Sequence, residues 1–165
     1  MPEAIRAGII TVSDKGFRHE RDDASGPEIR RLLESSSIIV ESCDIVPDEK
    51  DLISIKIREY SDEKCLDLIL TTGGTGVSPR DVTPEATLEV IEKEVPGIAE
   101  YMRAKSAAIT PHAIISRAVA GIRNKSLIIN LPGSPRGAKE NLSFLLSALE
   151  HAIEKIKGDP SECAT

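Results

Sequence analysis

Residues 71–84 read Thr-Thr-Gly-Gly-Thr-Gly-Val-Ser-Pro-Arg-Asp-Val-Thr-Pro, a run rich in glycine and hydroxyl groups. Cys65–Leu70, just before it, is a short apolar run of strand length, and Thr83-Pro84 at its end is typical of a helix start. A strand, a flexible turn and a helix therefore follow one another. Glycines let a backbone approach a ligand closely, and N–H groups at a helix start can point at an anion. The stretch indicates a phosphate-binding loop.

This loop differs from the common nucleotide-binding signatures. It lacks the Gly-Lys-Ser/Thr ending of a P-loop and the glycine spacing of a dinucleotide fingerprint. Arg80 is its only basic residue, and Asp81 beside it adds a negative charge. Because a bare phosphate would meet that carboxylate, the sequence predicts a divalent cation at the site.

The composition is typical of one globular domain, residues 1–165, with 40% hydrophobic residues. A net charge of −6 and an aromatic content of 2% argue against a nucleic-acid surface, which needs basic patches and often stacking side chains. Cys43, Cys65 and Cys163 are widely spaced and odd in number, which suits reduced thiols. The chain starts with no leader pattern and has no membrane-length apolar stretch. We expect a cytoplasmic protein with small-molecule ligands and no membrane or nucleic-acid partner.

Strand patterns alternate with helix patterns along the chain. The predicted strands are Ala4–Val12, Ser37–Val46, Cys65–Leu70 and Ser126–Leu131. The predicted helices start at a capping box over Ser25–Glu28, cover residues 52–57, form two pieces between 83 and 107 broken at Pro96-Gly97, and close with residues 142–156 before Gly158. Residues 13–24 are predicted to form a loop. The alternation predicts an α/β fold of three layers, α/β/α, with a central, mostly parallel sheet.

Four polar segments each follow directly after a predicted strand. They are Ser13-Asp14, Pro47-Asp48, Thr71–Gly76 and Asn130–Pro135. In parallel α/β sheets, ligands bind beyond the carboxyl ends of the strands. We therefore expect the four segments to meet at one edge of the sheet and to share a ligand pocket.

A set of motifs in a characteristic order covers nearly the whole chain. The motifs are Thr11–Asp14, Asp23–Pro27, Pro47–Glu49, Thr71–Gly76, Pro79–Thr87, Ser116-Arg117 and Asn130–Pro135. The set resembles the MogA and MoaB family of molybdenum-cofactor biosynthesis proteins, which is related to the pterin-adenylylating domain of gephyrin-like proteins. The glycine loop alone is less specific, because competence-damage domains and molybdenum insertases carry similar loops.

The resemblance implies molybdopterin adenylylation. In this reaction ATP and molybdopterin give adenylyl-molybdopterin and pyrophosphate, with Mg²⁺ as the cofactor. The attacking group would be the terminal phosphate of the pterin, so no serine, cysteine or histidine nucleophile is needed, and the sequence offers no convincing one. Positioning and charge neutralisation would then be the main catalytic contributions.

Asp48 and Asp81 match the two acidic positions of the family's active site. The resemblance assigns them as catalytic residues that bind Mg²⁺ or orient the substrates, since carboxylates beside phosphates are best explained by a metal. The residues alone favour structural roles, in which Asp48 caps the following helix and Asp81 fixes a turn before Thr83.

The other implied binding positions lie on the same strand-end segments. Ser13 and Asp14 would line the pterin or phosphate side. The glycine-loop contacts to nucleotide or pyrophosphate would come from Thr71, Gly73, Gly74, Thr75, Gly76, Ser78 and Arg80. The last segment would close the pocket through Asn130, Pro132, Gly133 and Ser134. Arg136 would either join it or be a solvated residue of the next helix.

The chain departs from the family pattern in two places. Relatives often have glycine at the position of His19, so the turn there is in question, whereas His112 and His151 are interpreted as ordinary residues. The chain also lacks the long C-terminal insertion of some MogA enzymes. The alternatives are therefore a MoaB-like pterin-binding or scaffold protein with little or no transferase activity, or a nucleotide-cleaving domain of the competence-damage type. The resemblance also implies a homo-oligomer, a trimer or hexamer, and hand-over of the product to a molybdenum insertase.

Overall fold

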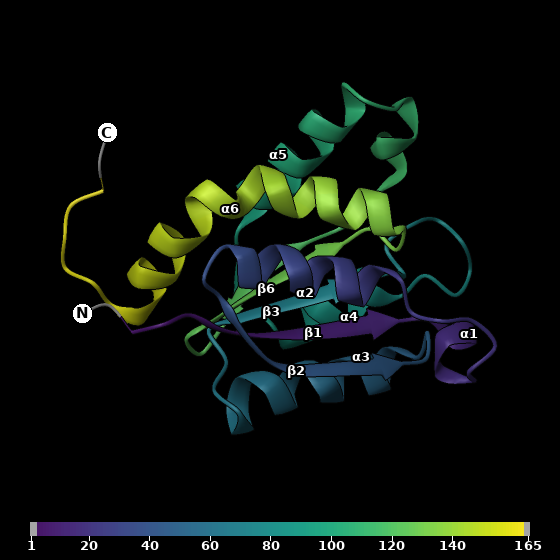
Figure 1. The fold of residues 1–165 in the computed structure, drawn as a ribbon, viewed down its shortest axis with the longest axis horizontal. Helices are drawn as coiled ribbons and strands as arrows, with labels where there is room; N and C mark the ends of the chain where they lie inside the picture. The colour runs from purple at the N-terminus through teal and green to yellow at the C-terminus, as the bar shows by residue number, and fades with distance from the viewer. Residues whose placement is uncertain (1–2, 164–165) are drawn as a thin grey trace.

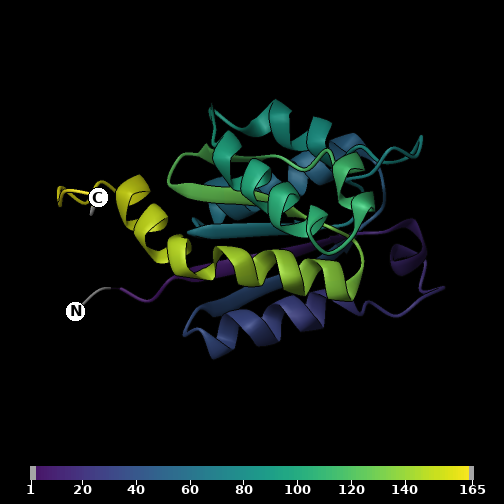
Figure 2. The ribbon, with the colours of Figure 1, turned by 90° about the horizontal axis from the view of Figure 1, so that it is seen from above.

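The computed structural model describes residues 3–163 and consists of one sheet flanked by helices on both faces (Figures 1 and 2). The elements follow the order β1 (Arg6–Val12), α1 (Asp14–Phe17), α2 (Ser25–Ser35), β2 (Ile39–Val46), α3 (Lys50–Arg58), a π-helical turn η1 (Glu59–Glu63), β3 (Leu68–Thr72), α4 (Thr83–Val90), β4 (Lys93–Glu94), α5 (Pro96–Ala107), a 3₁₀ turn η2 (Pro111–Ile115), β5 (Ala120–Arg123), β6 (Ser126–Leu131) and α6 (Pro135–Lys157).

The sheet has six strands in the order β2-β1-β3-β6-β5-β4. The first four strands run parallel, whereas β5 pairs antiparallel with β6 and β4 pairs antiparallel with β5. The carboxyl ends of the parallel strands point to the right in Figure 1, toward α1. The predicted three-layer α/β fold with a mostly parallel sheet is confirmed.

Alternating side chains of the central strands supply two separate cores. Ile9 and Leu70 pack on one face with α2, α5 and α6, while Ile10 and Ile69 pack on the other face with α3 and α4. Successive side chains of a strand point to opposite faces, so strands covered on both sides are apolar throughout. This explains why residues 68–70 form a continuous apolar run without alternation.

Several elements differ from the sequence predictions. Strands β1 and β2 each begin two residues later than predicted. The third strand is Leu68–Thr72 and not Cys65–Leu70, because Cys65 has a left-handed φ of 51° and belongs to the turn before the strand. Residues 13–24 contain the short helix α1. Strands β4 and β5 were not predicted from the sequence, since each is short and β5 reads Ala-Gly-Ile-Arg, with little β-branched character.

Two predicted helix caps are wrong, whereas one predicted helix end is confirmed. The capping box at Ser25–Glu28 does not form: the Asp23 carboxylate accepts the N–H of Gly26 at 3.0 Å instead. Thr83 is inside α4 with Pro84 in the first turn, and Val82 is the N-cap residue. The closing helix α6 ends at Gly158, whose φ of 99° is the left-handed geometry of a glycine cap.

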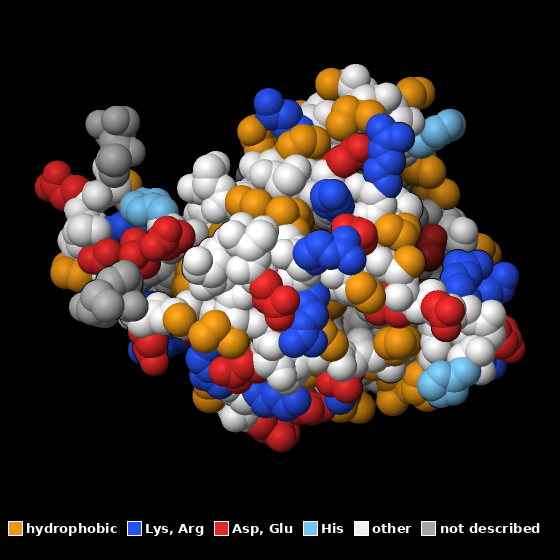
Figure 3. Space-filling model, in the orientation of Figure 1, with side chains coloured by type: hydrophobic (Ala, Val, Ile, Leu, Met, Phe, Trp, Pro, Cys, Tyr) orange, Lys and Arg blue, Asp and Glu red, His pale blue; other side chains and the backbone are white. Residues whose placement is uncertain are grey.

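Charges of both signs are interspersed on the face shown in Figure 3. Ion pairs one helical turn apart include Arg30–Glu34 on α2 and Arg136–Glu140 on α6. Such pairs contribute little stability individually. Within residues 3–163, no helix combines the length and the apolar character that crossing a membrane requires.

Candidate functional site

The four predicted strand-end segments meet at one edge of the sheet. They border a cavity of about 560 Å³, which we call the carboxylate cavity. The residues that line it include Ser13, Asp48, Gly73, Gly74, Asp81, Gly133 and Ser134, together with Arg21, Asp22 and Asp23 from the segment before α2. The prediction that these segments gather around one pocket is confirmed.

Two glycines bend the chain sharply where it leaves β3. Gly73 has a φ of 102° and Gly74 a φ of 67°, both in the left-handed region. A β-carbon at position 73 would lie 2.3 Å from the carbonyl oxygen of Val12, so the glycine loop approaches the end of β1 too closely for a side chain. The turn therefore places backbone groups at the cavity, as a ligand-binding glycine loop requires.

Thr83 fastens the glycine loop to the start of α4. Its hydroxyl donates to the carbonyl of Gly73 at 2.9 Å, and its backbone N–H donates to the carbonyl of Gly74 at 3.1 Å. Thr83 is fully buried. Its role is thus to close the loop, in place of the capping role that the sequence predicted.

Asp14 and Asp48 form a reciprocal cross-link between the first two strand ends. The N–H of Asp14 donates to Asp48 Oδ2 at 2.9 Å, and the N–H of Asp48 donates to Asp14 Oδ1 at 3.0 Å. Asp48 does not cap α3, whose N-cap residue is Glu49. The capping alternative for Asp48 therefore does not apply.

Arg80 is paired with the acidic side chains on the outer side of this cross-link. Its guanidinium donates to Asp14 at 2.6 and 3.0 Å and to Glu49 at 2.8 Å. The Arg80 guanidinium lowers the pKa of Asp14 below its ordinary value. A substrate anion that contacts Arg80 would have to compete with these carboxylates.

Asp48 experiences the opposite electrostatic environment. Partial burial, reinforced by the negative charges of Asp14 and Asp81, raises the pKa of Asp48 above its ordinary value. Asp81 Oδ2 accepts the N–H of Ser78 at 2.9 Å, so Asp81 fixes a turn and also lines the cavity. Neither Asp48 Oδ1 nor Asp81 Oδ1 accepts a hydrogen bond within the described chain. Two carboxylates with a free oxygen each can therefore face a cation.

We expect Asp48→Asn to be at least as stable as the wild type at neutral pH. Because the pKa of Asp48 is raised in the folded state, the ionised carboxylate destabilises the fold. This destabilisation develops as the pH rises from the pKa of Asp48 in the unfolded chain through its pKa in the folded protein. The asparagine oxygen can still accept the N–H of Asp14. Urea unfolding at neutral pH should show the gain, which should vanish below the ordinary aspartate pKa. Marked destabilisation at neutral pH would contradict this electrostatic picture.

Thr71 and Asn130 do not reach the cavity. Both are fully buried, with 0% of the side chain exposed, and they face each other across β3 and β6. The Asn130 amide donates to the hydroxyls of Thr71 and Thr87 at 2.9 Å each and accepts the N–H of Val119. Both residues were expected among the binding positions, whereas the structure places their side chains in the interior, where they join the ends of two strands to α4 and to the segment before β5.

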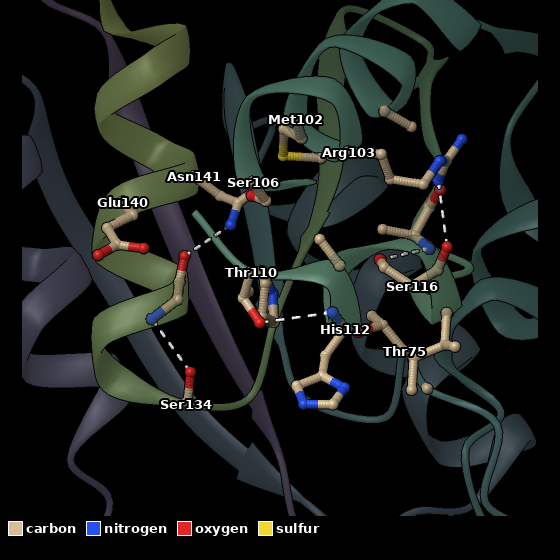
Figure 4. Close-up of a pocket in the computed structure, with 17 residues that line it drawn as sticks. Thr75, Met102, Arg103, Ser106, Thr110, His112, Ser116, Ser134, Glu140 and Asn141 are labelled. Atoms are coloured by element: carbon tan, nitrogen blue, oxygen red, sulfur yellow. Dashed lines mark hydrogen bonds between the residues drawn. The ribbon is translucent and has the colours of Figure 1, made fainter. Parts of the chain in front are cut away.

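A second cavity lies on the other side of the glycine loop, between α5, η2 and the start of α6 (Figure 4). This α5–α6 cavity measures about 260 Å³. Apolar side chains such as Met102 and Ile115 line it together with hydroxyl and amide groups, among them Ser106, Thr110 and Asn141. Such a lining suits a flat heteroaromatic ring, which needs apolar contact and a few hydrogen bonds.

Ser134 and the glycine loop separate the two cavities. Ser134 lines both, whereas Gly73 and Gly74 face the carboxylate cavity and Thr75 and Gly76 face the α5–α6 cavity. Ser134 also caps α6 by accepting the N–H of Gly137 at 3.0 Å. A ligand that occupies both cavities would therefore pass over Ser134 and the glycine loop.

The remaining predicted positions take different places. Pro132 lines the α5–α6 cavity and Gly133 the carboxylate cavity, whereas Ser78 and Arg80 line neither. Arg136 is a surface residue with 82% of its side chain exposed, paired with Glu140. His19 has a φ of 58°, the left-handed geometry that favours glycine.

Three residues near the site were not predicted as functional from the sequence. Arg21 is the only Lys or Arg that lines the carboxylate cavity in the described part of the chain. His112, interpreted as ordinary, lines the α5–α6 cavity. Arg117 donates to the carbonyls of Gly76 and Asp81 in the glycine loop and lines neither cavity. His112 and Arg117 come from the connection between α5 and β5, which follows no parallel strand, so the rule that identified the other loops does not apply to them. Arg21 does follow the parallel strand β1, but it lies beyond α1, several residues after the strand end.

The fold agrees with the comparisons with known proteins. The family model described as a probable molybdopterin binding domain matches residues 8–151, and the chain belongs to this family. Its structure is similar to that of the molybdopterin biosynthesis enzyme MoaB from Thermus thermophilus, with 50% identity and a TM-score of 0.89 over 96% of this chain and 99% of that one.

Curated relatives include complete bacterial proteins and parts of larger ones. The chain is 42% identical to a molybdopterin adenylyltransferase of Helicobacter pylori, over 95% of this chain and 90% of that protein. It is also 42% identical to the molybdenum cofactor synthesis protein cinnamon of Drosophila melanogaster, over 96% of this chain and 27% of that protein. The chain thus spans about a quarter of the length of the Drosophila relative.

Proposed function

We propose that the protein is a molybdopterin adenylyltransferase, which transfers AMP from ATP to the terminal phosphate of molybdopterin and releases pyrophosphate. The observation that supports this most directly is the pair of cavities that share Ser134 and the glycine loop, with Asp48 and Asp81 lining one of them. A transferase must hold two substrates side by side, and this arrangement offers adjoining sites of different chemistry. The bacterial adenylyltransferases that match over most of the chain support the same reaction.

The carboxylate cavity fits a magnesium ion together with phosphates. Mg²⁺ is commonly bound by one or two carboxylates plus substrate phosphates and water, and it neutralises charge that develops on phosphate oxygens. Asp48 and Asp81 supply two carboxylates, while no group of three or more metal-binding side chains occurs among the described residues. We propose that these two residues hold the ion.

The protein itself contributes binding and orientation. The backbone of Gly73 and Gly74 lies against the carboxylate cavity, where it can approach phosphate oxygens closely. The α5–α6 cavity can hold a heteroaromatic ring of one substrate, and Ser134 at the boundary can donate to a bridging phosphate. Alignment of two anions in this way accounts for catalysis without a side-chain nucleophile.

The decisive experiment mixes the purified protein with molybdopterin, ATP and Mg²⁺ and measures adenylyl-molybdopterin and pyrophosphate by mass spectrometry. The expected result is both products in equal amounts, with none when Mg²⁺ is chelated. Binding of molybdopterin without product, under conditions in which a Helicobacter pylori relative is active, would instead support the pterin-binding scaffold.

The homo-oligomeric state and hand-over to a molybdenum insertase stay predictions from the family resemblance.

Arg21→Ala should raise KM for the anionic substrates by about tenfold, the effect of one lost charge-assisted hydrogen bond. Arg21 is the only basic side chain among those that line the carboxylate cavity, beside the negative Asp22 and Asp23. Steady-state kinetics would measure the change. Arg31→Ala on exposed α2, which removes the Glu28 pair, is the matched control and should leave KM unchanged. Equal KM values for both variants would place Arg21 outside the binding site.

A further inference from the structure

Arg117 holds the two ends of the exposed part of the glycine loop with one side chain. Its Nε donates to the carbonyl of Gly76 at 2.7 Å, and its Nη2 donates to the carbonyl of Asp81 at 2.8 Å. The third nitrogen, Nη1, pairs with the carboxylate of Glu85 on α4. The backbone N–H of Arg117 also donates to the carbonyl of Thr75 at 2.8 Å.

The segment between these anchors has few other attachments. Residues 77–80 are all exposed. Their turn is closed only locally, through the N–H of Asp81 to the carbonyl of Ser78 and the N–H of Ser78 to the Asp81 carboxylate, while Arg80 reaches across to Asp14. Asp81 is therefore held in place by Arg117, by the exposed ion pairs of Arg80 and, two residues further along the chain, by the buried Thr83.

We propose that Arg117 is a positioning residue that sets the distance between the carboxylates of Asp81 and Asp48, and thereby the affinity of the site for Mg²⁺. Arg117 lines neither cavity, so it acts through the loop and not by contact with substrate. The neighbouring residue Ser116 lines the α5–α6 cavity. The same segment therefore borders the α5–α6 cavity and, through Arg117, holds the part of the glycine loop that carries Asp81 to the carboxylate cavity. The inference rests on the proposed function, because Mg²⁺ binding by the two carboxylates is part of it.

The shape of the guanidinium is essential to this role. Arg117 directs three donors at three acceptors in a fixed plane, whereas a lysine ammonium is a single flexible point charge that cannot match that geometry. Arg117→Lys keeps the charge but loses the simultaneous hold on Gly76 and Asp81. Glu85→Gln removes the ion pair and leaves both carbonyl contacts in place.

The test combines kinetics with limited proteolysis of the full chain. In Arg117→Lys, we expect the Mg²⁺ concentration for half-maximal activity to rise by about tenfold and kcat to fall, with KM for ATP at saturating Mg²⁺ changed by less than about threefold. Cleavage by trypsin after Arg80, which needs the loop to open, should be about tenfold faster. Glu85→Gln should show a smaller change in the same direction, and Arg117→Ala a larger one.

Arg123→Lys is the matched control. Arg123 also pairs with a carboxylate, that of Asp62, and donates to a backbone carbonyl, that of Val90, but it lies on β5 away from both cavities. It should change neither the Mg²⁺ dependence nor cleavage after Arg80. A loss of stability in Arg117→Lys without these two effects would indicate a structural role alone and would overturn the proposal.

Proteolysis separates this inference from the proposed function. If the wild type makes no adenylyl-molybdopterin, the proposed function fails, yet trypsin cleavage with and without Mg²⁺ alone still reports on the loop. Mg²⁺ should slow cleavage after Arg80 in the wild type and have a weaker effect in Arg117→Lys. Unchanged cleavage in Arg117→Lys would overturn the role of Arg117 even if the wild type is fully active.

Discussion

Asp81→Asn should lower the rate of adenylyl transfer by about 10²–10³, a loss comparable with removing one preorganised electrostatic contact to the transition state. The substitution removes one of the two carboxylates that we assign to Mg²⁺. The asparagine side-chain oxygen can still accept the N–H of Ser78, the bond by which Asp81 closes its turn at 2.9 Å. The loop therefore keeps its shape while the charge is lost, and the free energy of unfolding should hardly change.

Three measurements on this variant separate charge from structure. Turnover at saturating ATP and molybdopterin gives the loss in kcat, a Mg²⁺ titration shows whether metal binding is impaired, and urea unfolding gives the stability. Asp51→Asn is the matched control, because Asp51 is exposed in the first turn of α3 and lines neither cavity. If Asp81→Asn kept wild-type turnover, Asp81 would only be a turn-forming residue.

The fold was largely predictable because its local signals are strong. Strand β6 was predicted at Ser126–Leu131 and has these bounds, since an apolar run is followed there by the strand-breaking pair Pro132-Gly133. The antiparallel edge strands were missed, because β4 is two residues long and exists only through its pairing with β5. Such an edge depends on tertiary contacts that no local pattern encodes.

The location of the site was also predictable, whereas the role of each side chain was not. The rule that parallel strands end at one edge brought Ser13, Asp48 and Gly73 to one cavity. It could not distinguish side chains pointing into the cavity from those pointing into the core. Thr71 and Asn130 belong to the same strand-end segments, yet their side chains pair with each other in the interior.

The features that could not be predicted from the sequence are contacts between residues far apart in the chain. Arg117 contacts carbonyls 41 and 36 residues away, and nothing in its neighbourhood in sequence indicates those contacts. The raised pKa of Asp48 likewise results from burial and from the charges of Asp14 and Asp81, which only the fold brings together. Sequence patterns find the elements and loops, while the electrostatic environment requires the assembled structure.

Gly73→Ala should destabilise the protein by about 2–5 kcal/mol, the sum of left-handed backbone strain and overpacking. The new β-carbon would lie 2.3 Å from the Val12 carbonyl oxygen, an atom of the sheet backbone that cannot rotate away. Relief of this clash must move the glycine loop away from β1. Because Gly73 and Gly74 border the carboxylate cavity, adenylyl transfer should fall as well.

Gly97→Ala makes the same chemical change where the backbone and the surroundings permit it. Gly97 lies in the first turn of α5, and a β-carbon there would have no atom within 4 Å. Alanine in a helix should therefore stabilise the protein by about 0.5–1 kcal/mol. If the left-handed turn is essential, urea unfolding should show that Gly73→Ala lowers the free energy of unfolding and that Gly97→Ala raises it. Turnover of each variant is measured at a temperature at which that variant is folded. Equal stability of the two variants would mean that the glycine loop can relax around a side chain, and the close approach of Gly73 to Val12 would then not be what shapes the site.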